Sequence, residues 1–293
     1  MRITQLLAFS CKNDNMLSLI KIELYKIFKQ KRSYIGFAAL IVIILLSHIA
    51  MKWEGQEMHE FITQNLSDAF FMQGNLVNGY LVTFLVLNFL WVHVPLLIVL
   101  VTADLISGEA QAGTFRIILT RPVSRAKLIT AKYIAAMLYT FVFMVIFAVL
   151  SLGVGLWIFG KGDLMVIIGS VNIFSESDVL WRFILAFIYG FISMCTVAAL
   201  SLLLSSLSGN SLSPILSTMA IIIVFTFIST LNLGIFSTVK PFLLTTYLDS
   251  WQSLFSYDVK LREIFLDAFI LCIHIFIFYG LTIFIFRKKD ILT

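Results

Sequence analysis

The chain has 293 residues, of which 60% are hydrophobic and 13% are charged, and its mean hydropathy is +1.00. Soluble domains contain about 45–50% apolar and about 25% charged residues, so this composition excludes a soluble globular protein. The formal net charge is +5, but the Lys and Arg residues gather at the ends of apolar segments, which is typical of membrane proteins and argues against nucleic-acid binding. The length accommodates several membrane spans but no large soluble domain in addition.

Six uninterrupted apolar stretches predict six transmembrane helices. They cover residues 34–51, 80–102, 133–159, 180–204, 215–231 and 264–286. Several contain 20 or more residues, the length that crosses roughly 30 Å of hydrocarbon. The alternating pattern of a transmembrane barrel is absent, so the expected fold class is an all-α integral membrane protein.

Basic residues fall mainly on one side of the six predicted spans. The segment up to Arg32, the second and fourth connections and the C-terminal tail together carry 15 Lys and Arg residues, whereas the other three connections carry six. Cytoplasmic loops of membrane proteins are enriched in these residues. The asymmetry therefore predicts that both termini are cytoplasmic.

An amphipathic segment at residues 16–33 precedes the first span. Its apolar residues share one arc of a helical wheel, and its lysines, Lys26 among them, point away from that arc. Such a helix is expected to lie in the inner headgroup layer with its lysines towards anionic lipid. Residues 1–15 differ from this pattern, and we expect translation to begin at Met16 or these residues to be dispensable.

Two outer connections are longer than simple turns. Residues 232–262 are rich in aromatic and aliphatic side chains, which predicts a short interfacial or re-entrant helix. A further short helix is expected around residues 57–71. In the second span, Pro95 removes the hydrogen bond to the Trp91 carbonyl and is expected to kink the helix.

The spans contain few groups that could perform chemistry. The candidates for an intramembrane polar site are Asn88, His93, Asp267 and His274. Asp267 and His274 are seven residues apart and share a helix face, which would suit a proton or metal path. Alternatively, Asp267 reaches water near the outer boundary and the histidine bonds a backbone group. We expect no catalytic residue and no metal site in this chain.

The second inner connection, residues 103–132, is far longer than neighbouring helices require. Charged residues alternate there with apolar ones, which predicts a short amphipathic helical element that breaks at Gly113 and stops at Pro122. Ser124 is placed to cap the next span. Composition alone would equally suit an interfacial loop.

From Asp104 to Lys132 the sequence reads D-L-I-S-G-E-x-x-x-G-T-x-R-x-x-L-x-R-P-V-S-R-x-x-L-x-x-A-K. This pattern resembles the inner-loop signature of ABC-2 type transporter permeases. The single-domain bacterial branch is the most similar, with its permeases for copper-site maturation of nitrous oxide reductase, for gliding and for peptide-antibiotic immunity. The resemblance extends to residues 20–32, 246–251 and 286–291.

The resemblance implies a domain organisation and partners. Residues 1–15 would be an extension, 16–33 an elbow helix and 34–293 the six-helix permease domain, with a coupling segment at 103–132. That segment would sit in a separate ATPase subunit, which binds ATP and Mg, so this chain would hold no cofactor. The coupling residues that it indicates are Asp104, Glu109, Gly113, Thr114, Arg116, Arg121, Pro122 and Arg125.

The function implied is that of a permease subunit, not an enzyme by itself, of an ATP-driven exporter. It would form a homodimer in the bacterial cytoplasmic (inner) membrane. Glu109, at mid-segment, is the acidic residue expected to contact the ATPase. Two alternatives stay open. A six-helix secondary carrier or channel driven by an ion gradient would use Asp267, His274 and His93, although the sequence shows no inverted repeat. A membrane scaffold that docks an ATPase without transport would share every sequence feature.

Overall fold

The computed structural model describes residues 15–63, 77–115, 123–168, 170–231 and 234–289. Within these ranges, six helical segments are long and apolar enough to cross a membrane. They are α3 (Lys31–Thr63), α5 and α6 (His93–Thr102 and Asp104–Gln111), α8 to α9 (Arg125–Ala148, a π-helix Val149–Val154, and Gly155–Phe159), α10 (Glu176–Leu207), α11 (Leu212–Thr230) and α13 (Leu261–Lys288). The predicted class, an all-α membrane protein with six spans, is confirmed.

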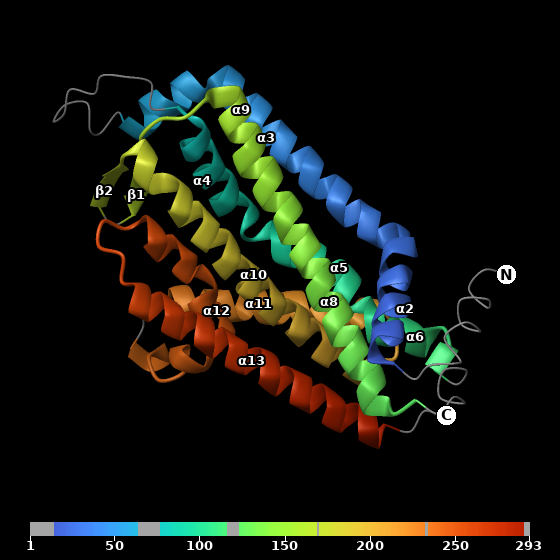
Figure 1. The fold of residues 1–293 in the computed structure, drawn as a ribbon. Coiled ribbons are helices and arrows are strands. Elements are labelled where there is room, and N and C mark those ends of the chain that lie inside the picture. The colour runs from blue at the N-terminus through green and yellow to red at the C-terminus, as the bar shows by residue number, and fades with distance from the viewer. Residues whose placement is uncertain (1–14, 64–76, 116–122, 169, 232–233, 290–293) are drawn as a thin grey trace.

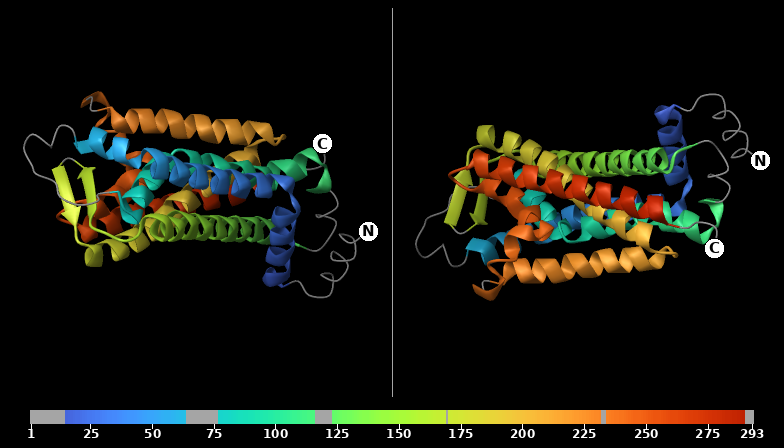
Figure 2. Two further views of the ribbon diagram at one scale, coloured as in Figure 1. Left: turned by 90° about the horizontal axis from the view of Figure 1, so that it is seen from above. Right: turned by 90° about the horizontal axis from the view of Figure 1, so that it is seen from below.

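The long helices form one elongated bundle (Figure 1). Helix α2 (Met16–Lys29) crosses one end of it, which we call the α2 end, and an antiparallel hairpin of β1 (Leu164–Ile168) and β2 (Ser170–Phe174) lies at the other. Helix α10 is central and packs against α5, α8, α11 and α13. Helix α11 lies along the side of the bundle (Figure 2), and only 11% of its apolar stretch is buried, against 67% for α10.

The predicted second span is broken into two helices. Helix α4 (Gly79–Leu90) and helix α5 are separated at Trp91 and Val92, just before Pro95. The proline has no N–H for the Trp91 carbonyl, so the predicted kink is confirmed. At 1.5 Å per residue, α4 and α5 together span at most about 36 Å, enough for the hydrocarbon layer. Helix α6 follows after Ala103, and we expect it to lie beyond that layer.

The first span differs from its predicted limits. Helix α2 ends at Lys29, and the extended backbone of Gln30 separates it from α3. Helix α3 then begins before the predicted start at residue 34 and continues past the predicted end at residue 51. The short helix expected around residues 57–71 is, up to Thr63, a continuation of α3, because the segment contains no proline and the single Gly55 is tolerated inside the helix. Its remainder lies outside the described residues.

The connection between α11 and α13 (Leu261–Lys288) folds back into the bundle. It contains short 3-10 helices at Gly234–Phe236 and Lys240–Phe242, helix α12 (Leu244–Leu248) and a further 3-10 helix at Asp249–Phe255. Trp251 is fully buried and its ring packs against Phe84, Trp91 and Phe255. The buried Arg182 donates to the Leu254 carbonyl over 2.6 Å and fixes the end of this segment. The expected short helix is present, whereas the β1–β2 hairpin was not predicted.

Close packing of two glycines joins α4 to α9. A Cβ atom on Gly79 would lie 2.6 Å from the Gly155 carbonyl oxygen, closer than real contacts allow. We therefore expect Gly79→Ala to destabilise the protein by about 1–3 kcal/mol, the usual range for overpacking. Denaturant titration of the purified protein in detergent measures this change. Gly153→Ala is the control, since no described atom lies within 4 Å of a Cβ there; equal effects of the two substitutions would contradict the packing argument.

Candidate functional site

Helix α6 is the element at the α2 end that the sequence signature indicated. It continues the direction of α5 after the single residue Ala103, so the two helices form one nearly continuous rod. The helix ends at Ala112, whose N–H donates to the Gly108 carbonyl. Gly113 follows with a φ of 66°, a conformation that glycine adopts without the steric cost of a side chain. The predicted break at Gly113 is confirmed.

Four charged residues from three helices meet beside α6. They are Glu23 and Lys26 of α2, Glu109 of α6 and Lys132 of α8, and we call them the four-charge cluster. The Lys132 Nζ atom lies 3.0 Å from Glu23 Oε2 and 2.8 Å from Glu109 Oε2. The Lys26 Nζ atom lies 2.7 Å from Glu23 Oε1 and 2.6 Å from Glu109 Oε1. Each carboxylate thus bridges both ammonium groups, and the formal charges sum to zero.

The four-charge cluster is largely shielded from water. The Lys132 side chain is 0% exposed and the Glu23 side chain 3%, whereas Lys26 remains 32% exposed. Lys132 Nζ donates hydrogen bonds to Glu23 Oε2 over 3.0 Å and to the Leu105 carbonyl over 2.8 Å, and its contact with Glu109 Oε2 is an ion pair. Burial lowers the pKa of Lys26, but Glu23 and Glu109 together raise it by more, so the pKa lies above the ordinary 10.5. Complete pairing is what makes these buried charges tolerable.

Serine side chains fix the other side of α6. The Ser107 N–H donates to Ser205 Oγ of α10 over 2.8 Å, and that hydroxyl donates to the Ala103 carbonyl. Gln111 Oε1 accepts from both the N–H and the hydroxyl of Ser211, each over 3.0 Å. Helix α6 is therefore tied to α10 and to the start of α11, as well as to α2 and α8.

An ion pair at the start of α6 joins it to α3. Asp104 Oδ1 lies 2.8 Å from Arg32 Nη1. The Arg32 side chain is 48% exposed, so we expect this pair to contribute little to stability. Gly108 lies one turn later, and a Cβ there would be 2.6 Å from the Asp104 carboxylate. A glycine at position 108 thus leaves room for the aspartate.

The other predicted coupling residues have local structural contacts or fall outside the described ranges. Thr114 Oγ1 donates to the Glu109 carbonyl over 3.2 Å. Arg125 Nη1 donates to three carbonyls at the end of α13, those of Phe286, Arg287 and Lys289. Ser124 caps α8, as predicted, by accepting from the Lys127 N–H. Arg116, Arg121 and Pro122 lie outside the described residues.

Two charged side chains of the sequence analysis have partners within the chain. Glu109, for which contact with an ATPase is predicted, has its carboxylate paired with Lys26 and Lys132. Lys26 was expected to face lipid, but it points into the same cluster. A helical wheel of α2 alone cannot show that α6 and α8 pack against its edge.

Glu23 and Lys132 were not singled out from the sequence. Glu23 lies on the helical wheel beside Ile20 and Ile27, at the edge of the apolar arc. A carboxylate there is costly without a partner, and this was the signal that could have identified it. Lys132 ends the quoted signature, eight residues inside α8, where a lone ammonium likewise requires a carboxylate.

The four candidates for an intramembrane polar site each have a different partner. Asn88 accepts from Gln252 over 2.9 Å, and Asp267 accepts from Ser250 over 2.7 Å, so both hold the Asp249–Phe255 helix. One ring nitrogen of each histidine lies within hydrogen-bond distance of the carbonyl four residues earlier, and His93 is exposed on the bundle surface. Among the described residues, no hydrogen bond or ion pair joins any two of the four. Over the same ranges, no three His, Cys, Asp or Glu side chains gather as metal ligands.

Comparison with known proteins places this architecture in a family. The search of curated proteins finds no match. The family profile described as "ABC-2 family transporter protein" matches residues 17–291, which include α2, α6 and all six membrane-spanning segments. The chain therefore belongs to the ABC-2 family of transporter proteins and is a permease of the ABC-2 type, the membrane subunit of an ABC transporter.

Proposed function

We propose that this permease couples ATP hydrolysis on a separate ATPase subunit to the export of a substrate, and that α6 is its coupling helix. The observation that carries the proposal is the attachment of α6. It follows α5 after a single residue and is bonded on its flanks to α2, α8 and α10. A displacement of α6 would therefore move three other helices directly.

The part of α6 that is open to a partner is its tip. Gln111, Ala112 and Gly113 are exposed, whereas Leu105, Ile106 and Ser107 are buried against the bundle. We propose that residues 111–113 enter the ATPase and that Glu109 acts one turn earlier, by holding the helix. The tip is small, which permits close approach of two backbones.

Coupling then requires two states of the permease with different affinities for the closed ATPase dimer. ATP and Mg, bound by the ATPase, favour closure, and closure favours the position of α6 that fits it. Glu109 of α6 is paired with Lys132 of α8 and with Lys26 of α2. A shift of α6 would therefore tilt the attached helices as rigid bodies. Two copies of the chain would enclose the substrate path, as the family resemblance implies. Export is the direction that the resemblance indicates.

The proposed orientation places the α2 end in the cytoplasm of a bacterial inner membrane. In a background without native cysteines, cysteine replacing Glu57 or Tyr257 should react with an impermeant thiol reagent in intact cells. Cysteine replacing Ala112 should react only after the cells are opened. All three positions are exposed in the structure, so burial does not explain a difference. Equal labelling of Ala112 and Glu57 positions in intact cells would contradict this orientation.

Co-purification tests the function itself. The tagged full-length chain, isolated from its host in mild detergent, should carry an ABC ATPase in equal amount. In reconstituted vesicles, Ala112→Trp at the α6 tip should lower capture of that ATPase, while Ile223→Trp, exposed in the middle of α11, should not. The ion-driven carrier is favoured instead if no ATPase is captured and an imposed ion gradient alone drives transport.

A further inference from the structure

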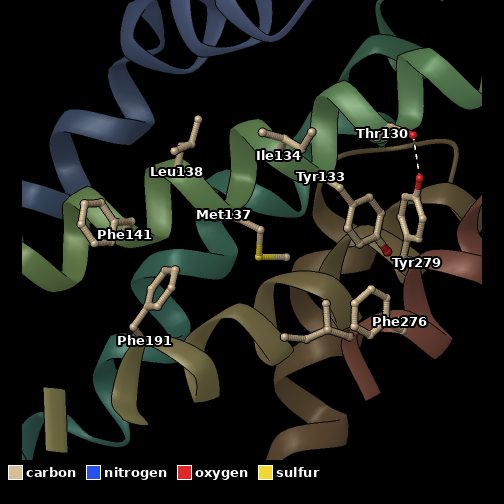
Figure 3. A pocket seen from close by; sticks show the side chains of 10 residues that line it. Thr130, Tyr133, Ile134, Met137, Leu138, Phe141, Phe191, Phe276 and Tyr279 are labelled. Carbon is tan, nitrogen blue, oxygen red and sulfur yellow. Dashed lines mark hydrogen bonds between the residues drawn. The ribbon is translucent and has the colours of Figure 1, made fainter. Parts of the chain in front are cut away.

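An apolar groove runs along the bundle surface between α8 and α13 (Figure 3). Its volume is about 530 Å³, and α10 forms its floor near Phe191. The wall from α8 includes Ile134, Met137 and Phe141, and the wall from α13 includes Phe276. The residues of both walls lie within the predicted third and sixth spans, so we expect the groove to lie at the depth of the membrane hydrocarbon.

The three hydroxyl groups that line the groove are bonded within the protein. Thr130 Oγ1 and the Tyr279 hydroxyl lie 2.7 Å apart, as the dashed line in Figure 3 marks. The Tyr133 hydroxyl lies 2.8 Å from Thr282 Oγ1 and donates to the Ala199 carbonyl over 3.2 Å. The groove therefore offers apolar contact and little hydrogen bonding. A polypeptide segment would leave its backbone groups unsatisfied there, whereas an acyl chain carries no such groups.

Basic residues lie near the end of the groove that Thr130 and Tyr279 line. Arg125, at the start of α8, bonds the last carbonyls of α13, so the two helices meet at the α2 end. Lys127 is exposed and lies seven residues before Ile134, on the same face of α8. Arg287 is exposed near the end of α13. Two cations thus stand within about two turns of the groove, at the depth expected for the headgroup layer.

We propose that this groove binds one acyl chain of an anionic phospholipid, whose headgroup phosphate contacts Lys127 and Arg287. Basic residues beside grooves between membrane helices bind the headgroups of anionic lipids. A second copy of the chain is the other occupant to consider. An apolar helix face of that copy would fill the groove but would offer no anionic partner to Lys127 and Arg287. The inference depends on the membrane position of α8 and α13 and not on the proposed coupling to ATP.

The test uses the purified full-length chain and phosphatidylglycerol, with phosphatidylcholine as the neutral comparison, in native mass spectrometry. Met137→Trp, which fills the groove, should weaken phosphatidylglycerol binding at least about tenfold because several methylene groups lose their contacts. Val145→Trp, on an exposed part of α8 outside the groove, should not change it. Lys127→Gln should reduce the preference for phosphatidylglycerol over phosphatidylcholine about fivefold, the factor for one basic residue near a headgroup.

Phosphatidylglycerol with a photoreactive acyl chain then locates the site. Cross-links should concentrate in the peptide that contains Met137 and decrease in Met137→Trp. Cross-links spread evenly over α3 and α11 would overturn the proposal, as would equal lipid binding by Met137→Trp and Val145→Trp. If Met137→Trp instead converts a dimer into a monomer, and the dimer excludes the lipid, the groove is an interface between two copies and the proposal is wrong.

Discussion

Lys132→Met is expected to destabilise the folded permease by about 3–5 kcal/mol, the range observed when one partner of a buried ion pair is removed. The Lys132 side chain is 0% exposed and contacts both carboxylates of the four-charge cluster. Without it, Glu23 and Glu109 share only the Lys26 ammonium, and the cluster carries a net negative charge in a poorly solvated place. Methionine preserves most of the volume, so the loss arises from charge and not from a cavity. Denaturant titration in detergent measures the change.

Lys21→Met is the matched control, because it removes a lysine that is exposed on α2. Its effect should stay within about 0.5 kcal/mol, as for most surface substitutions. Limited proteolysis adds a structural readout: α2 should become accessible in Lys132→Met, since its ion pair to α8, Glu23–Lys132, is lost. A Lys132→Met protein as stable as wild type, with α2 still protected, would show that the four-charge cluster does not hold the helix.

The six spans could be predicted from the sequence because hydropathy over about 20 residues is a local property. The same holds for the break before Pro95, the turn at Gly113 and the Ser124 cap, each of which depends on one residue and its neighbours. The β1–β2 hairpin escaped prediction because its strands, Leu164–Ile168 and Ser170–Phe174, are short apolar runs next to long helices, where a strand pattern is easily missed.

The four-charge cluster could not be predicted in the same way. Glu23 and Lys132 are separated by more than 100 residues, and their meeting depends on how α2 crosses the bundle. The signature between Asp104 and Lys132 indicated the family, which the profile match confirms, yet it did not distinguish residues that would face a partner subunit from residues that fix the helix. Glu109 shows the difference: position in the segment suggested an outward contact, and packing gave it an inward one.

Single and double substitutions of Glu109 and Lys132 can distinguish two roles of Glu109, an internal one that holds α6 and direct contact with the ATPase. Glu109→Leu alone should destabilise the protein by about 2–5 kcal/mol and weaken capture of the ATPase, because two ammonium groups then share one carboxylate. The double variant Glu109→Leu with Lys132→Met removes one charge of each sign and leaves the neutral Glu23–Lys26 pair, 2.7 Å apart. We therefore expect it to be more stable than the sum of the two single effects by about 0.5–3 kcal/mol, the range for coupled neighbours.

Capture of the ATPase should follow the same cycle if Glu109 acts by holding α6. The double variant would then recover part of the ATPase capture that Glu109→Leu loses, because no unpaired charge remains beside α6 to displace it. The measurement is the ATPase-to-permease ratio after co-purification, taken at equal amounts of folded protein for all four members of the cycle. Glu109→Leu combined with Lys21→Met controls for the loss of any lysine. If capture is lost equally with and without Lys132→Met while stability recovers, Glu109 contacts the ATPase itself, and the internal role assigned to it would have to be given up.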